Sequence, residues 1–203
     1  AAGWFDEVDG IPASRIAAWD GSSWMALGQG ITTPSASSPT IVYDLVADRR
    51  GGIYAGGDFT SAGGAPANNI AYWSGGAWSS LGEGTSGEIK LDKRFDDVWS
   101  LALDADGQLY AGGEFTVAGG VPANHVARWD GSSWTPLGAG TNDRVDALTV
   151  DGTSLYAVGD FTQAGGLDAS HVARWSGTAW QALGDGLCSG SRALQVHRGV
   201  VYA

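Results

Sequence analysis

Short runs in which apolar and polar residues alternate recur along the whole chain, and each run ends at glycine, aspartate or serine. In residues 145–183, the runs VDALTV, LYAVG, HVARW and AWQAL follow one another with turn residues between them. A period of two residues, with many β-branched and aromatic side chains, predicts β-strands. No stretch of helical length carries an amphipathic period. The pattern therefore predicts an all-β chain.

This group of four runs is repeated. Residues 53–84, 109–140 and 155–186 are three copies, and a fourth spans residues 3–5 and 11–30. Turn pairs such as Asp130-Gly131 separate the last two runs of a copy, which indicates a hairpin. Every copy places two tryptophans around that turn: Trp19/Trp24, Trp73/Trp78, Trp129/Trp134 and Trp175/Trp180. Because all copies share them, we expect these rings to pack between sheets rather than to stack on sugar.

Four-stranded antiparallel units repeated in this way predict a β-propeller that forms a single domain over residues 1–203. Complete blades are expected at about residues 41–84, 98–140 and 145–186. A fourth blade would combine residues 193–203, which match inner strands, with residues 1–30, which match outer strands. We expect this pairing to close a ring of four blades of four antiparallel strands, without exposed edges. A fragment of a longer array is the alternative.

The motif GG[DE]FT-x-AGG-x-PAN-x-x-A-x-W, with the [IL]YAGG strand before it and W-x-x-L after it, carries a resemblance to known families. The blade resembles the kelch type. More closely, it is similar to the repeats of bacterial secreted propeller proteins and fungal Rax2-like cortical polarity proteins. The resemblance covers nearly the whole chain. It implies a secreted or surface propeller used for binding or scaffolding, and it brings no catalytic motif that maps onto this sequence.

Composition narrows the range of partners. Charged residues make up 16% of the chain and the formal net charge is −11, so a nucleic-acid partner is not expected. The sequence holds no apolar stretch long enough to insert into a membrane. Cys188 is the only cysteine and cannot form an internal disulfide, and a catalytic role for its thiol is not favoured. Together with the resemblance, these features favour an extracellular or cell-surface protein.

Long loops identify a candidate binding face. The links between strands 2 and 3 and between consecutive blades emerge on the same side of a propeller, and two inter-blade links are long, at residues 28–40 and 82–97. Loops on a rigid scaffold often bind partners, although an insertion can also be merely tolerated. The second loop concentrates charge, and its candidate ligand-binding residues are Lys90, Lys93, Arg94 and the adjacent Trp99. A solvated loop without a partner is the alternative.

A second candidate is the variable position before the [IV]A-x-W strand. It is occupied by Arg15, Asn69, His125 and His171, one in each copy. Because these residues should be spread around the ring, they do not predict a metal site. They would suit one weak ligand pocket per blade. Hydrogen bonding to neighbouring loops is the alternative.

Other polar positions are weaker candidates. Asp58, Glu114 and Asp160 recur one per blade, which favours a structural role such as capping backbone N–H groups. Asp104-Ala105-Asp106-Gly107 begins like a calcium loop but lacks the remaining ligands, so a hairpin turn explains it. The inner strands contribute non-equivalent residues to a central funnel: Asp44, Ser100, Asp146 and Arg192.

Three functions compete at this point. The first is a non-catalytic binding or adhesion propeller that recognises a protein or glycan on its loop-rich face. The second is a lectin-like propeller whose repeated pockets would give avidity. The third is a polysaccharide-active enzyme that uses the asymmetric funnel. No catalytic residue, metal or cofactor is assigned by the sequence.

Overall fold

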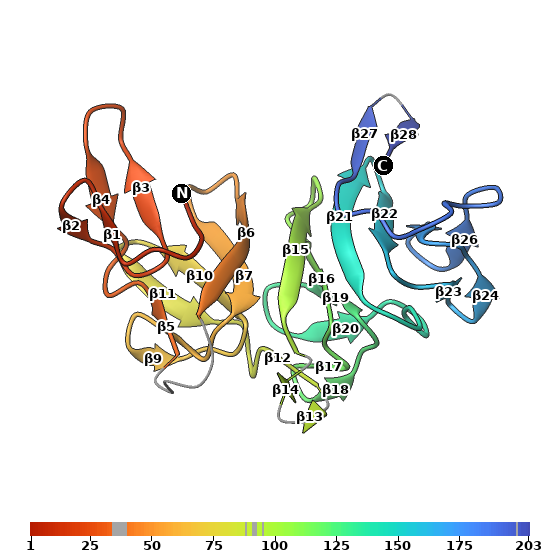
Figure 1. The fold of residues 1–203 in the computed structure, drawn as a ribbon, viewed down its shortest axis with the longest axis horizontal. Helices are drawn as coiled ribbons and strands as arrows, with labels where there is room; N and C mark the ends of the chain where they lie inside the picture. Colours follow the sequence, from red (N-terminus) through yellow and green to blue (C-terminus); the bar gives the residue numbers. More distant parts are fainter. Residues whose placement is uncertain (34–39, 88, 91–92, 95, 198) are drawn as a thin grey trace.

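The computed structural model describes residues 1–33, 40–87, 89–90, 93–94, 96–197 and 199–203, and in these residues the chain forms strands and turns without a helix. The predicted all-β class is therefore confirmed. Three four-stranded antiparallel sheets dominate the described part of the chain, and we call them blades A, B and C in chain order. They stand side by side in Figure 1.

Each blade runs from its innermost to its outermost strand in sequence order, as predicted. Blade A contains β6 (Ile41–Ala47), β7 (Ile53–Asp58), β10 (Ile70–Ser74) and β11 (Ala77–Ser80). Blade B contains β15 (Val98–Leu103), β16 (Leu109–Gly113), β19 (Val126–Trp129) and β20 (Trp134–Pro136). Blade C contains β21 (Val145–Asp151), β22 (Ser154–Gly159), β25 (Val172–Trp175) and β26 (Trp180–Ala182).

A hairpin lies at each end of the three blades. The N-terminal half-blade consists of β3 (Ala17–Trp19) and β4 (Trp24–Ala26), and the C-terminal half-blade consists of β27 (Gln195–His197) and β28 (Val200–Tyr202). Figure 1 shows them at opposite ends of an arc, with the two chain termini apart. Among the described strands, β3 pairs only with β4 and β28 only with β27. The expected ring closure by a composite blade is therefore not confirmed.

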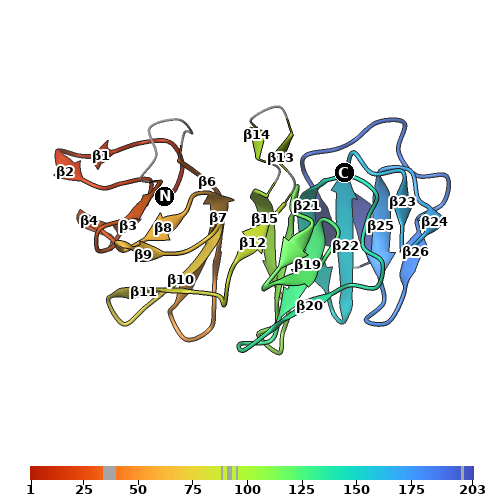
Figure 2. The same cartoon turned by 90° about the horizontal axis from the view of Figure 1, so that it is seen from below.

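The links that were predicted to share one face form small sheets there. The β5 (Ile31–Thr32), β8 (Ser61–Ala62) and β9 (Ala65–Pro66) strands make one sheet, and β12 (Thr85–Ser86), β17 (Val117–Ala118) and β18 (Val121–Pro122) make another. Separate hairpins are β1 (Glu7–Val8) with β2 (Ile11–Pro12), β13 (Ile89–Lys90) with β14 (Lys93–Arg94), and β23 (Gln163–Ala164) with β24 (Leu167–Asp168). Each three-stranded sheet joins an inter-blade link to the strand 2–3 hairpin of the next blade. The β13–β14 hairpin projects from this loop-rich face (Figure 2).

The hydrophobic core lies between sheets rather than inside any one blade. One buried cluster joins the N-terminal half-blade to blade A, a second joins A to B, and a third joins B to C. The predicted packing role of the tryptophans is confirmed for the pairs of blades A, B and C, whereas Trp19 of the N-terminal half-blade is 52% exposed. The indole N–H groups of Trp78, Trp134 and Trp180 each donate to a leucine carbonyl of the preceding unit, at 2.8, 2.9 and 2.7 Å. These bonds fix how far one sheet is rotated from the next.

The paired glycines of strand 2 mark close approaches. A Cβ on Gly112 would lie 2.7 Å from a methyl of Val145 in the next blade. A Cβ on Gly113 would lie 1.9 Å from the Asp97 carbonyl oxygen of the neighbouring strand. The first glycine therefore permits sheet-to-sheet contact, and the second makes room for the inner strand of its own blade.

Candidate functional site

The inner strand of every complete blade carries a β-bulge at the same place. The pairing register shifts between Val42 and Asp44, between Val98 and Ser100, and between Val145 and Ala147. The extra residues are therefore Tyr43, Trp99 and Asp146. A bulge reorients a side chain relative to the regular pleat, and bulges are common next to functional sites. Here the bulges present three chemically different side chains at one end of the inner strands.

Two of these side chains form an aromatic pair across blades A and B. The rings of Tyr43 and Trp99 are stacked, with centroids 4.9 Å apart and an angle of 10° between their planes. The guanidinium carbon of Arg144, just before β21, lies 5.1 Å from the centroid of a Trp99 ring, which is a cation–π contact. Three consecutive inner strands thus contribute to one continuous cluster.

Arg144 is also the centre of an acidic group. Its Nε lies 2.9 Å from Asp146 Oδ1, Nη2 lies 3.0 Å from Asp160 Oδ2, and Nη1 lies 3.5 Å from Glu114 Oε1. The contact with Asp146 is an ion pair without an aligned hydrogen bond. Three carboxylates therefore share one guanidinium, and the group has an excess of negative charge.

We call this cluster the mouth, because it lies where the inner strands begin on the loop-rich face. It consists of Tyr43, Trp99, Glu114, Arg144, Asp146 and Asp160.

Several polar atoms at the mouth are buried but have no hydrogen-bond partner among the described residues. They include Trp99 Nε1 and Glu114 Oε2, with His125 Nδ1 beside them. Glu114 as a residue is only 9% exposed. Buried polar groups are normally paired, so several unpaired ones in one place indicate a position for water or a ligand. The exposed edge of the mouth consists of Tyr43, which is 38% exposed, and Asp160, whose side chain is 46% exposed.

Burial and charge alter the acid–base behaviour of this region. Burial, reinforced by Asp97, Asp58 and Glu114, raises the pKa of Tyr43 to about 12, so its phenol remains neutral. Burial also raises the pKa of Asp146, although the nearby Arg144 acts in the opposite direction.

The pKa of the His125 imidazole is lowered rather than raised. Burial lowers its pKa, and the surrounding Asp143 and Glu114 only partly offset that effect. His125 therefore favours the neutral form, and the mouth keeps its negative charge.

The four residues of the variable position share a left-handed backbone conformation, which was not predicted from the sequence. Arg15, Asn69, His125 and His171 all have positive φ, between 62° and 66°. In each copy the backbone N–H of this residue donates to the carbonyl of the repeated phenylalanine, and its own carbonyl accepts from the glycine two positions before that phenylalanine, as His125 does with Phe115 and Gly113. The position is thus a sharp corner of the repeat.

Two of the four side chains reach the link that leads into the next blade, whereas His171 contacts its own blade. Arg15 Nε donates to the Thr40 carbonyl at 2.8 Å, and Asn69 Nδ2 donates to the Asp96 carbonyl at 3.0 Å. His171 Nδ1 lies 3.1 Å from the Gly159 carbonyl. The four residues lie one in each repeat, and Arg15 and Asn69 act as clamps between loops.

The charged loop is described only in part. Lys90, Lys93 and Arg94 belong to the β13–β14 hairpin, in which Lys90 pairs with Lys93 and Ile89 with Arg94. The positions of their side chains lie outside the described part of the chain, as do Glu88 and Asp92 and residues 34–39 of the first long loop. Trp99, the fourth candidate from this region, is the residue that the structure places in the mouth.

Two of the acids that recur one per blade share a partner that was not predicted. Glu114 and Asp160 both form ion pairs with Arg144. Arg144 and Tyr43 were not recognised in the sequence. The available signal was the difference between copies: at the position of Arg144, one residue before the valine at the bulge, blades A and B carry Ile41 and Asp97.

The inner-strand residues Asp44 and Ser100 connect blades instead of lining an open funnel. Asp44 Oδ2 accepts the Leu101 N–H at 2.7 Å, and Ser100 Oγ accepts the Leu148 N–H at 3.0 Å. Each bond ties one inner strand to the inner strand of the following blade. Burial raises the pKa of Asp44, while these hydrogen bonds act in the opposite direction.

Other candidate chemistry receives little support within the described residues. They contain no group of three or more His, Cys, Asp or Glu side chains placed to hold a metal ion. Asp104 is occupied by its own turn, because its carboxylate accepts the N–H groups of Asp106 and Gln108. The Cys188 thiol is free and exposed. None of the described segments is a helix with the length and apolarity needed to cross a bilayer.

Comparison with known proteins supports the fold class. Residues 105–130, from the first turn of blade B to its third strand, match the family described as "Domain of unknown function (DUF5122) beta-propeller". No curated protein and no solved structure matches the chain. The family match and the repeated antiparallel sheets together make this an all-β chain with a propeller repeat.

Proposed function

We propose that this chain is a non-catalytic binding or adhesion propeller, secreted or displayed at the cell surface, which binds a protein partner at its mouth. The observation that carries the proposal is the convergence of an aromatic pair, an excess of carboxylates and unpaired buried polar atoms at one place on the loop-rich face. The resemblance to secreted and Rax2-like propellers supports the same function and location.

The chemistry of the mouth favours a basic segment of the partner. A lysine or arginine side chain gains both from the face of an aromatic ring and from nearby carboxylates. Asp58 and Asp97 add negative charge around Tyr43. The net charge of −11 would also speed the approach of a cationic partner. Nothing in this arrangement requires a chemical step.

The experiment is a titration of the chain with short oligolysine and oligoarginine peptides at moderate salt. Glu114→Gln removes one charge from the mouth, whereas the matched Asp185→Asn removes one charge from an exposed turn elsewhere. We expect Glu114→Gln to weaken binding about tenfold and Asp185→Asn to change it by less than about twofold. Trp99→Leu should weaken oligoarginine binding as well, with folding checked by circular dichroism.

Equal losses in the two charge variants would contradict a specific site and assign the binding to the acidic surface as a whole. A glycan array run in parallel tests the alternative function. Saturable binding of a sugar at several sites per chain would favour the multivalent lectin, with pockets at Arg15, Asn69, His125 and His171. Turnover of a polysaccharide, lost on Asp146→Asn, would favour the enzyme.

We also propose that the two half-blades complete one blade and close a four-bladed ring. At each of the three junctions between successive units, a tryptophan ring of the following unit covers a glycine. Trp73, Trp129 and Trp175 lie 3.2, 3.6 and 3.4 Å from the Cβ positions of Gly28, Gly82 and Gly138. The equivalent Gly184 has nothing within 4 Å, and the equivalent Trp19 is 52% exposed. The two surfaces are complementary, and closure would bury both.

Ring closure changes the expected effect of a substitution at Trp19 on stability. In a closed ring, Trp19→Ala should destabilise the chain by about 3 kcal/mol, comparable to Trp129→Ala, because both remove a ring from a sheet-to-sheet contact. In an open arc, Trp19→Ala should change the stability by less than about 1 kcal/mol. Urea unfolding of the two variants, followed by far-ultraviolet circular dichroism, separates these outcomes. A neutral Trp19→Ala would refute the closed ring.

A further inference from the structure

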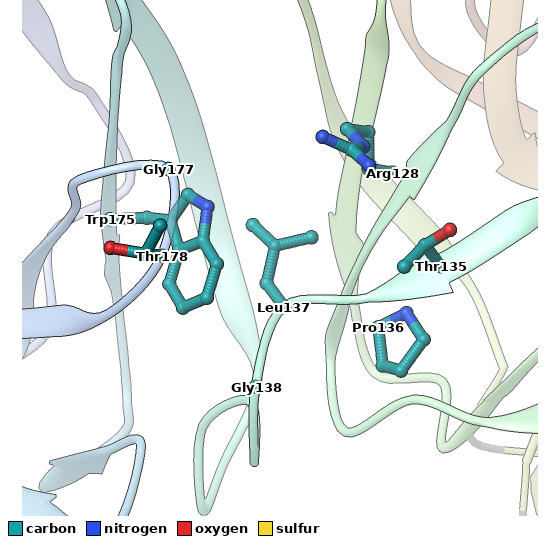
Figure 3. Close-up of a pocket in the computed structure, with 8 residues that line it drawn as sticks. All are labelled: Arg128, Thr135, Pro136, Leu137, Gly138, Trp175, Gly177 and Thr178. Atoms are coloured by element: carbon teal, nitrogen blue, oxygen red, sulfur yellow. The ribbon is translucent and has the colours of Figure 1, made fainter.

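A cleft lies between the outer parts of blades B and C, away from the mouth. Its volume is about 350 Å³. Blade B contributes residues of β19, β20 and the link after β20, and blade C contributes the end of β25 and the turn that follows. Figure 3 shows its eight lining residues: Arg128, Thr135, Pro136, Leu137, Gly138, Trp175, Gly177 and Thr178.

The floor of the cleft is apolar. Figure 3 shows Leu137 between the indole of Trp175 on one side and Arg128 on the other. Leu137 is 2% exposed, and Trp175 is half-buried, with its other contact to Trp180 at a centroid distance of 5.5 Å. Because Gly138 has no side chain, the Trp175 ring reaches this position without obstruction. The flat, half-buried ring of Trp175, with the buried Leu137 beside it, offers a surface suited to the C–H face of a small ring compound.

Arg128 supplies the charged group. Its equivalent in blade C, Arg174, is held by two hydrogen bonds to Ser154 Oγ, at 2.9 and 2.7 Å. Arg128 stands opposite Tyr110 in the strand pairing and its side chain interacts with the Tyr110 hydroxyl, but it forms no ion pair with any residue in the described part of the chain. A guanidinium without a carboxylate partner can bind a carboxylate through two parallel N–H···O bonds. The exposed Thr135 and Thr178 add hydroxyl groups at the rim.

We propose that this cleft binds a hexuronate, a pyranose ring that carries a carboxylate. The apolar face of the sugar would lie on Trp175, its carboxylate would meet Arg128, and its hydroxyls would bond with the threonines at the rim. The volume is at the small end of the range of about 300–1,000 Å³ for ligand pockets, which suits one sugar unit. This site is separate from the mouth and does not depend on the function proposed for it.

The other junctions lack this combination, so the proposal assigns one site to the described part of the chain. Between blades A and B, the position of Arg128 is taken by Tyr72, whose hydroxyl donates to Asp48 at 2.6 Å and whose ring packs on Tyr54. Between the N-terminal half-blade and blade A, it is taken by Ala18. Neither residue offers a cation to a carboxylate.

The test is a titration of the intact chain with galacturonate, with galactose as the neutral control. Tryptophan fluorescence and ligand-observed NMR measure the binding. We expect saturable galacturonate binding at one site and at least tenfold weaker binding of galactose. Arg128→Gln should reduce galacturonate binding to the level of galactose. Arg174→Gln, which makes the same change at the equivalent position of blade C, should leave galacturonate binding unchanged.

A short oligogalacturonide in the same assay distinguishes a polymer ligand from a free sugar. Binding tighter than that of the monosaccharide would mean that the cleft receives one unit of a polymer, and equal binding would mean that it receives a single sugar. The proposal is overturned if galactose binds as well as galacturonate, if Arg128→Gln has no effect, or if no uronate binds. Because oligolysine binding is measured at the mouth, failure here leaves the proposed function untouched.

Discussion

Trp134→Ala should lower the free energy of unfolding by about 3–5 kcal/mol, the usual cost of removing a large aromatic side chain from a core. Trp134 is 7% exposed and packs in the cluster between blades A and B. Its indole N–H donates to the Leu81 carbonyl at 2.9 Å, so the substitution also leaves that carbonyl without its partner. For a chain of this size the melting temperature should fall by roughly 10 °C. Chemical and thermal unfolding, both followed by circular dichroism, measure the effect.

Trp134→Phe separates the two contributions. Phenylalanine keeps most of the apolar contact but cannot donate to Leu81, so a smaller loss of about 1–2 kcal/mol is expected. If Trp134→Ala cost less than about 1 kcal/mol, the packing between blades A and B would not be a principal source of stability. The assignment of the core to the junctions between sheets would then be mistaken.

Gly113→Ala should destabilise the chain by about 3 kcal/mol or more, although it adds only one methyl group. A Cβ at this position would lie 1.9 Å from the Asp97 carbonyl oxygen, and backbone atoms on a paired strand cannot move away as a flexible side chain can. The same restriction exists at Gly57 and Gly159, next to Ile41 and Arg144. The inner strand would have to shift, and the bulge that places Trp99 in the mouth would shift with it.

Gly107→Ala is the matched control for Gly113→Ala. Gly107 lies in the first turn of blade B, where a Cβ would meet nothing within 4 Å, but its φ is +83°. The expected cost is therefore only about 1 kcal/mol, from the positive φ. Urea unfolding measures both variants. If both variants cost the same, steric overlap with the Asp97 carbonyl would not be the reason that position 113 requires glycine.

Much of the blade could be predicted because its signals are local and occur in every copy. Alternating residues gave the strands, Asp130-Gly131 and its counterparts gave the hairpin turns, and Trp129 with Trp134 indicated a buried face. Each of these depends on neighbours in sequence or on the partner strand of one hairpin. Repetition then strengthened each prediction, because the same residue had to suit the same environment several times.

The candidate site could be predicted from the sequence only in small part. Trp99 was identified only as a neighbour of a charged loop, whereas its partners Tyr43 and Arg144 lie on different blades. The sequence showed that the inner strands differ from copy to copy but not that a bulge in each strand brings the differing residues together. Nor did it show that the variable position has positive φ in Asn69 and its equivalents.

The sequence by itself determined the class of fold, the order of strands in each blade and the face on which the long links emerge, because these follow from local periodicity and from turn residues. The tertiary structure decided which acids converge on Arg144, that Asp44 and Ser100 join neighbouring blades, and that Arg128 lacks an ion-pair partner in the described part of the chain. Those features depend on the rotation of one sheet against the next. That rotation arises from packing between residues far apart in the sequence, so no pattern within a single repeat contains it.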